Sequence, residues 1–160
     1  MENFNIFWEM LYYKVTFGLS LEELILKLND KYSPKLLSQK NIKKLYTLAD
    51  EVEIKGEYSQ GFKEFVSSEY IKGNYISKAS YFRSYKSIRR YWLVLGYIFN
   101  TPSNIYNIWQ YLLEDSNISL DTTRKFVENM ALCSDFLVVN EDNYVIPFDI
   151  KNGNYIISDF

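Results

Sequence analysis

The residues best placed to do chemistry in this 160-residue chain are cations without acidic neighbours. Between positions 71 and 113 there is no Asp or Glu, and there are six basic residues: Lys72, Lys78, Arg83, Lys86, Arg89 and Arg90. The other positions carry 12 of the 18 Lys and Arg residues and all 20 Asp and Glu residues. The formal net charge of −2 therefore conceals a basic middle between acidic flanks. Such a local basic surface favours a polyanion or an acidic partner.

The spacing of these cations predicts a stripe on a helix. Arg83, Lys86 and Arg90 are separated by three and four residues, so they fall on one helical face, with Arg89 beside it. Because no acid is interleaved, ion pairs within the helix cannot neutralise the stripe. Three alternatives remain open: the stripe faces solvent, it contacts phosphates, or it pairs with acidic residues elsewhere in the chain.

Residues suited to catalysis or metal binding are sparse. The sequence has no His, the commonest general base at neutral pH and the commonest metal ligand, and no P-loop motif. Its one Cys, Cys133, follows an apolar stretch, which favours a small buried hydrophobe over a nucleophile. Two patterns faintly resemble metal-dependent nuclease sites, Asp50 with Glu53-Ile54-Lys55 and Asp142 with Asp149-Ile150-Lys151, but such short patterns arise by chance. We therefore predict a protein that is not an enzyme and that has no cofactor and no metal.

The elements that must position the cations are clearest in the second half. Apolar residues recur at helical steps over 85–99 and again after the Thr101-Pro102 pair, which predicts two helices, the second beginning at that pair. Ser119 is expected to cap a third helix. Residues 136–146 read as two short strands joined by a polar turn, and this predicts a β-hairpin.

This order of helix, helix, turn, helix and hairpin resembles the winged helix-turn-helix family. The resemblance covers residues 80–148 and lies in the pattern of elements. Residues 103–109 look like the second helix of such a domain, and 118–126 look like the turn and the start of its recognition helix. Cys133-Ser134-Asp135 stand where a Gly often ends the third helix. The resemblance implies DNA binding, with the outward residues of the third helix nearest the bases: Thr122, Arg124 and Lys125.

The first half follows the same plan more loosely over residues 3–66. Helices are expected over 3–17 and, capped by Ser20, over 21–28, followed by a third helix from Ser38 and half of a wing at 53–58. The outward face of that third helix carries three lysines, whose point charges suit phosphates better than base edges: Lys40, Lys43 and Lys44.

These patterns predict a mainly α protein with short β-hairpin wings. We expect a winged-helix-like unit over 1–66, a linker over 67–79, and a second unit with a C-terminal tail over 80–160, arranged in tandem around a shared aromatic core. Residues 1–5 lack the features of a secretory signal, and the uncharged stretch 91–113 is too polar for lipid. A cytoplasmic location without membrane contact is therefore expected.

Two functions compete at this stage. The leading prediction is a non-enzymatic protein that binds double-stranded DNA, either a transcriptional regulator or a replication or partition accessory of a mobile element or virus. Such a protein usually works as a homodimer on a two-fold site. The alternative is a virus- or phage-encoded inhibitor of a host defence nuclease, similar to anti-CRISPR proteins. It would bind this host protein through an acidic surface rich in Tyr, of which the chain has 15.

Overall fold

The structure, a computed structural model, describes residues 2–34, 37–73, 82–134, 136–149 and 151–155. The first half forms four helices among these residues: α1 (Glu2–Phe17), α2 (Leu21–Leu28), α3 (Gln39–Lys55) and α4 (Gln60–Lys72). The second half forms α5 (Tyr85–Asn100), α6 (Ile105–Leu113) and α7 (Leu120–Leu132). Two antiparallel hairpins follow: β1 (Val138–Asn140) with β2 (Asn143–Val145), and β3 (Phe148–Asp149) with β4 (Asn154–Tyr155). The prediction of a mainly α protein with short β-hairpins is confirmed.

Serine caps fix the starts of most helices. The Ser20 side chain accepts a hydrogen bond from the Glu23 backbone N–H, and the Glu23 carboxylate accepts one from the Ser20 N–H, which is the expected capping box. Ser38 and Ser119 cap α3 and α7, as predicted, and their side chains accept from the backbone N–H groups of Asn41 and Thr122. Gly18 ends α1 with a φ of 64°, a backbone conformation that side chains disfavour. These local signals explain why the helix positions could be predicted.

The start of α6 differs from the prediction. Thr101 and Pro102 do not begin this helix, and Asn104 is its N-cap instead. Ser103 lies in an extended bridge with Tyr144 of β2, donating its N–H to the Tyr144 carbonyl at 3.2 Å and accepting from the Tyr144 N–H at 2.8 Å. Because these backbone groups of Ser103 are engaged with the hairpin, α6 cannot begin before residue 104.

The wing predicted at 53–58 is wrong. Helix α3 continues to Lys55, and a turn then places Tyr58 inside the protein, 8% exposed. The Tyr58 hydroxyl donates to the carbonyl of Trp92 at 3.0 Å, so this segment packs on α5 instead of forming a strand. Among the described residues 2–34 and 37–73 no strand is present, so that part consists of helices joined by turns and loops.

The predicted linker over 67–79 is wrong as far as Lys72. Helix α4 covers its first residues and buries Phe65, Val66 and Glu69 on its inner face. Gly73, which suggested a flexible segment, is instead the C-cap of α4 with a φ of 76°. The boundary at residue 66 thus falls inside a helix, and residues 74–79 lie outside the described part of the chain.

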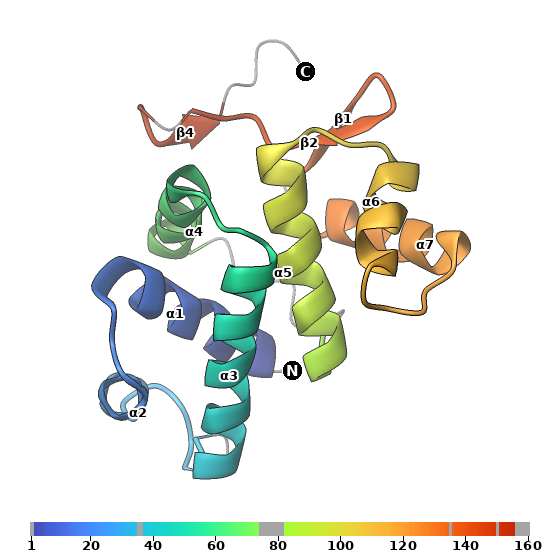
Figure 1. The fold of residues 1–160 in the computed structure, drawn as a ribbon. Coiled ribbons are helices and arrows are strands. Elements are labelled where there is room, and N and C mark those ends of the chain that lie inside the picture. Colours follow the sequence, from blue (N-terminus) through green and yellow to red (C-terminus); the bar gives the residue numbers. More distant parts are fainter. Residues whose placement is uncertain (1, 35–36, 74–81, 135, 150, 156–160) are drawn as a thin grey trace.

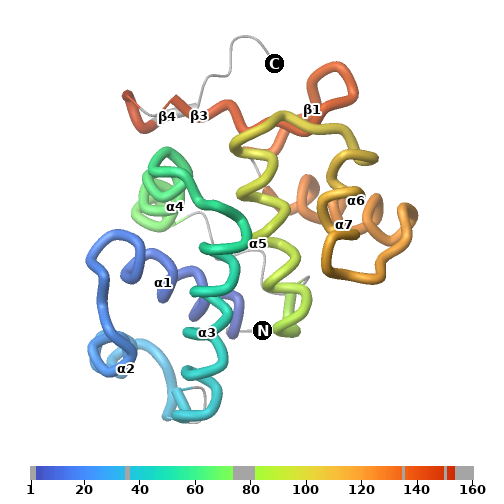
Figure 2. The backbone as a smooth tube through the Cα atoms, in the orientation of Figure 1, coloured from blue at the N-terminus to red at the C-terminus, as the bar shows by residue number. Residues whose placement is uncertain are grey.

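One aromatic core joins the two halves, as predicted. Trp92 of α5 is fully buried, and its ring centroid lies 4.9 Å from that of Trp8 and 6.4 Å from those of Phe4 and Phe62. Helix α5 stands between α1, α3 and α4 on one side and α6 and α7 on the other (Figure 2). Trp109 packs at the edge of this core and is only half-buried, with its indole N–H donating to the Ile118 carbonyl at 2.8 Å.

A buried carboxylate fastens α1 to the helices around it. Glu9 is 1% exposed, and its two oxygens accept from the Lys31 ammonium at 2.7 Å, the Tyr32 hydroxyl at 2.9 Å and the Tyr70 hydroxyl at 2.5 Å. A buried charge is tolerated when it is paired and hydrogen-bonded in this way. The first half is therefore held by polar as well as apolar contacts. None of the described helices is long and apolar enough to cross a membrane.

Candidate nucleic-acid interface

The three lysines predicted on the third helix of the first half are exposed together. Lys40, Lys43 and Lys44 lie along the first turns of α3 and, with Thr47, line a shallow hollow. The Lys44 ammonium lies 5.0 Å from the centroid of the Tyr85 ring, at the start of α5. These side chains therefore approach α5 from the α3 side.

Helix α5 begins beside the middle of α3, and the first turns of α3 extend beyond it (Figure 1). The Tyr85 hydroxyl donates to the side-chain oxygen of Asn41, and further along the helices Arg89 reaches Glu51. Contacts at two successive levels show that α3 and α5 run in the same direction. Both helix N-termini, with their partial positive charge, therefore lie at the same end of the molecule.

Arg83 and Lys86 are exposed at this end too. Arg83 precedes Ser84, the N-cap of α5, so the prediction that it lies on the helix is wrong, and Lys86 lies in the first turn. In the described part of the chain neither side chain forms an ion pair. We use the name α3–α5 basic surface for this set: Lys40, Lys43, Lys44, Arg83 and Lys86. Lys78, another cation of the predicted run, lies outside the described residues.

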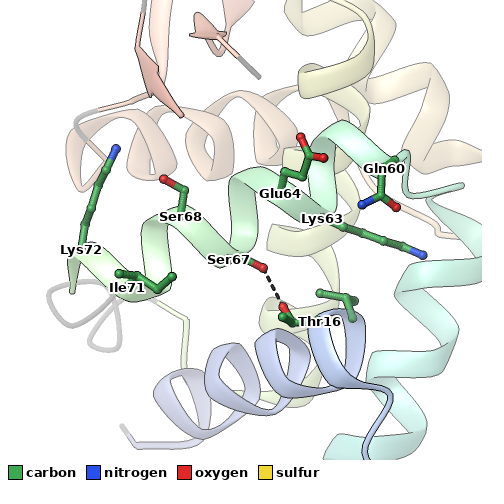
Figure 3. Close-up of a pocket in the computed structure, with 9 residues that line it drawn as sticks. Thr16, Gln60, Lys63, Glu64, Ser67, Ser68, Ile71 and Lys72 are labelled. Atoms are coloured by element: carbon green, nitrogen blue, oxygen red, sulfur yellow. Dashed lines mark hydrogen bonds between the residues drawn. The ribbon is translucent and has the colours of Figure 1, made fainter. Parts of the chain in front are cut away.

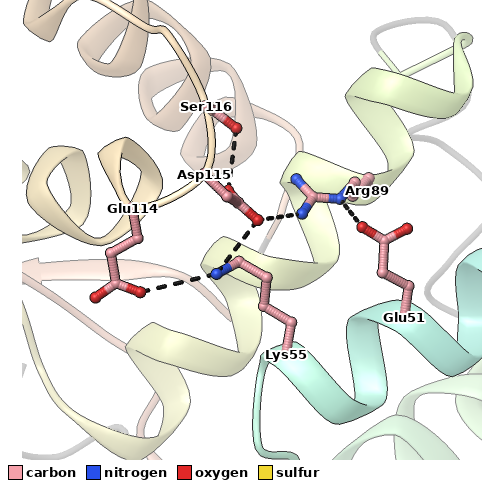
Figure 4. A network of polar contacts seen from close by, with 6 residues as sticks. All are labelled: Glu51, Lys55, Arg89, Glu114, Asp115 and Ser116. Atoms are coloured by element: carbon pink, nitrogen blue, oxygen red, sulfur yellow. Dashed lines mark hydrogen bonds and ion pairs between the residues drawn. The ribbon is translucent and has the colours of Figure 1, made fainter.

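Arg89 does not belong to this surface, because it pairs with the chain's own acids (Figure 4). Its Nε donates to Glu51 at 2.5 Å and its Nη2 donates to Asp115 at 2.6 Å, while Lys55 lies 3.3 Å from the same Asp115 carboxylate. Burial opposes the charge on Arg89, but the hydrogen bonds to Glu51 and Asp115 outweigh it and raise the pKa of the guanidinium. For Arg89, the alternative of intramolecular pairing is the one that holds.

Arg90 is half-buried against α7. Its guanidinium carbon lies 5.4 Å from the centroid of the Phe126 ring, a cation–π contact. Burial, followed by repulsion from Arg89, lowers the pKa of Arg90. Arg90 therefore fastens α5 to α7 and offers only part of its side chain to a ligand.

The three residues predicted on α7 are exposed, and acidic as well as basic side chains lie around them. The Thr122 hydroxyl accepts from Ser119 at 2.9 Å, within the helix cap. Lys125 lies 3.3 Å from Asp121, and Glu128 is exposed one turn beyond Arg124. Two cations and two acids therefore share this outer face, which is close to neutral. It is separated from the α3–α5 basic surface by the packing of α5 against α7.

A second hollow lies over α4, where the C-terminal end of α1 meets it (Figure 3). The hydroxyls of Thr16 and Ser67 share a hydrogen bond of 2.7 Å at its edge. Its two lysines already have partners, since Lys63 lies 3.0 Å from Glu53 and Lys72 donates to the Gly153 carbonyl at 3.1 Å. This hollow therefore adds no unpaired cation to a nucleic-acid interface.

The residues considered for catalysis or metal binding make structural contacts where the structure describes them. The described residues contain no group of three potential metal ligands of the types His, Cys, Asp and Glu. Cys133 is half-buried and its thiol donates to the Asn129 carbonyl at 3.0 Å. Asp149, one of the nuclease-like carboxylates, accepts from the Lys151 N–H and the Asn152 side chain in a hairpin turn.

Sequence reasoning missed the residues that decide which cations are available. Glu51 and Asp115 are 38 and 26 residues away from Arg89, so no local spacing identifies them as its partners. From the sequence, Tyr85 was expected only to form part of an apolar helix face. In the structure its ring contacts the Lys44 ammonium and its hydroxyl donates to Asn41. Comparisons with protein-family models, with curated proteins and with solved structures found no match to this chain.

Proposed function

We propose that the protein binds double-stranded DNA through a winged-helix-like unit formed by residues 82–149. The observation that carries the proposal is the backbone pairing of Ser103 with Tyr144. This bridge fastens hairpin β1–β2 beside α6 and α7, the position of a wing in such a domain. The order α5, bridge, α6, α7, hairpin then supports α7 as the helix that enters the major groove.

The exposed residues of α7 would make the contacts that distinguish sequences. Arg124 has the donor geometry for a guanine edge or a phosphate. Lys125 shares an exposed ion pair with Asp121, a contact weak enough to be exchanged for a phosphate. We extend the proposal to a role as transcriptional regulator or replication accessory that acts as a homodimer on a two-fold site.

Titration against a fluorescent duplex of mixed sequence tests the proposal. We expect binding at about 50 mM salt that weakens steeply towards about 200 mM, because counterions compete for the phosphates. The sequences selected from a random pool should then differ between the parent and Arg124→Ala. Lys151→Ala is the control, because it removes one exposed cation that lies outside α7. A parent protein that binds no duplex at low salt contradicts the proposal.

A second candidate, an inhibitor that binds a host defence nuclease, is favoured by the composition of the α7 face. Its charges are balanced, and it ends at Leu132, whose side chain is 79% exposed. Balanced charge with an exposed apolar residue suits a protein surface better than phosphates. In this case the protein should suppress nuclease activity without binding duplex, and Leu132→Asp should weaken the suppression.

A further inference from the structure

The α3–α5 basic surface gathers five cations that form no ion pair within the described residues. Six other basic residues form ion pairs with carboxylates: Lys14, Lys31, Lys55, Lys63, Arg89 and Lys125. Within the residues that the structure describes, none of the five cations of the surface has such a partner. Helix α5 contains no acid, and the first acid of α3 is Asp50. The charge of the surface is therefore not neutralised locally.

The backbone adds to this positive charge. Helices α3 and α5, of 17 and 16 residues, both begin at this end of the molecule. The partial positive charge of each N-terminus favours an anion there, and Lys40 and Lys86 lie in the first turns. Side chains and helix ends of two different segments thus favour the same kind of ligand.

The residue types point to phosphates on a duplex. Lysine is a flexible point charge that suits phosphate oxygens and does not read base edges well. Binding of single strands usually relies on aromatic side chains that stack on bases. Tyr85, the aromatic residue that contacts this surface, is half-buried, covered by Lys44 and hydrogen-bonded to Asn41. Its ring is therefore engaged within the protein.

The surface adjoins the proposed reading helix through α5. On one side of the start of α5, Lys44 contacts Tyr85; on the other, the Phe126 ring of α7 lies 5.4 Å from Arg90 and 5.2 Å from the Phe82 ring. Helices α3 and α7 therefore flank the same end of α5 (Figure 1). A duplex laid across that end would meet both.

We propose that the α3–α5 basic surface is a second DNA contact, which holds the phosphate backbone of the duplex beside the segment that α7 meets. It rests on the proposed function in two respects, that the ligand is duplex DNA and that α7 contacts it. The contact is independent of sequence, and it makes the first half of the chain part of the binding site. In this arrangement α3 and the start of α5 hold most of the phosphates, and α7 contacts the bases.

The test uses two pairs of substitutions with the same change in net charge. Lys40→Gln with Lys43→Gln removes two exposed cations of the surface, and Lys27→Gln with Lys151→Gln removes two exposed cations elsewhere. Affinity for a mixed-sequence duplex is measured across a salt series. We expect the first pair to weaken binding about tenfold or more at 100 mM salt, on every sequence, and to lower the slope of log K against log salt by about two.

The control pair should change the affinity by less than about twofold, because distant charges are screened at this salt concentration. An equal effect of both pairs, or no effect of the first pair on a protein that binds duplex, overturns the inference and leaves the proposed function standing. Tighter binding of a single strand than of the duplex, dependent on the first pair, overturns the assignment to duplex phosphates. Absence of all duplex binding by the parent overturns both proposals. Equal melting temperatures of the variants and the parent show that the fold is intact.

Discussion

Helices α3 and α7 are the third helices of their halves, and each begins at a serine cap, yet their outer faces differ in charge. On α3 the charges are segregated: lysines occupy the first turns, and the first two acids that follow, Asp50 and Glu51, are paired with Lys14 and Arg89. On α7 cations and acids alternate, and Lys125 lies beside Asp121. Segregated charge creates a field that acts on phosphates, whereas alternating charge cancels at a distance and leaves only close contacts. Similar local architecture can therefore serve two kinds of contact.

The largest loss of stability is expected from a substitution in the aromatic core that the two halves share. Trp92→Ala should cost about 3–5 kcal/mol of unfolding free energy, because this fully buried ring packs against α1 and α4. Trp109→Ala should cost less, since its side chain is half-buried. Chemical denaturation followed by circular dichroism measures both. If Trp92→Ala destabilises only part of the protein, seen as two separate transitions, then the two halves do not share one core.

A smaller effect is expected at the network that joins α3, α5 and the turn after α6. Hydrogen bonds from Arg89 and Lys55 outweigh burial and lower the pKa of Asp115 below its usual value of 3.8. A carboxyl with a lowered folded pKa contributes stability above its unfolded pKa and loses it as the pH falls towards the folded pKa. Asp115→Asn should therefore cost about 1 kcal/mol at pH 7, a modest figure because these groups are partly exposed to solvent.

The pH dependence separates the charge of Asp115 from its packing. As the pH falls below 3.8 towards the lowered pKa of folded Asp115, the parent loses this contribution, so the difference between parent and Asp115→Asn should shrink. Urea denaturation at pH 7, 5 and 3 measures it. A difference that stays constant over this range would show that the carboxylate charge does not contribute.

The smallest change in stability is expected at the exposed ion pair between Lys125 and Asp121 on α7. Lys125→Ala should change the unfolding free energy by no more than about 0.5 kcal/mol, because its ion pair with Asp121 is exposed. Thermal unfolding at low and high salt measures this change, with Asp121→Ala as the matched partner. A loss well above 1 kcal/mol would mean that this face is organised by its charges and is not a balanced, open surface.

Features that depend on residues close together in the sequence were the ones predicted most successfully. Helix starts at Ser20, Ser38 and Ser119 are set within a few residues, and these were predicted. Helix α4 was missed because residues 67–79 were assigned to a linker, although Gly73 serves as the cap of α4. The inward Phe and Val residues of α4 have a helical spacing that outweighs the single Gly within it.

The residues of the candidate site also differ in whether local spacing was enough to predict them. The lysines of α3 were predicted as an exposed face, because their spacing alone places them together. The pairing of Arg89 and the burial of Arg90 depend on α3, α7 and the turn after α6, which are distant in sequence. The bridge between Ser103 and Tyr144 likewise joins residues from different elements, and it displaced the predicted start of α6.

The common direction of α3 and α5 has a consequence for kinetics. Their parallel peptide dipoles add, and the lysines at the same end reinforce them, so the molecule carries a dipole moment despite a net charge of only −2. In the field of a polyanion such a molecule turns its positive end forward before contact, while its acidic remainder is repelled. Encounters in the wrong orientation become rare, and productive collisions become a larger fraction of the total. The association rate should then depend on ionic strength more strongly than the net charge implies.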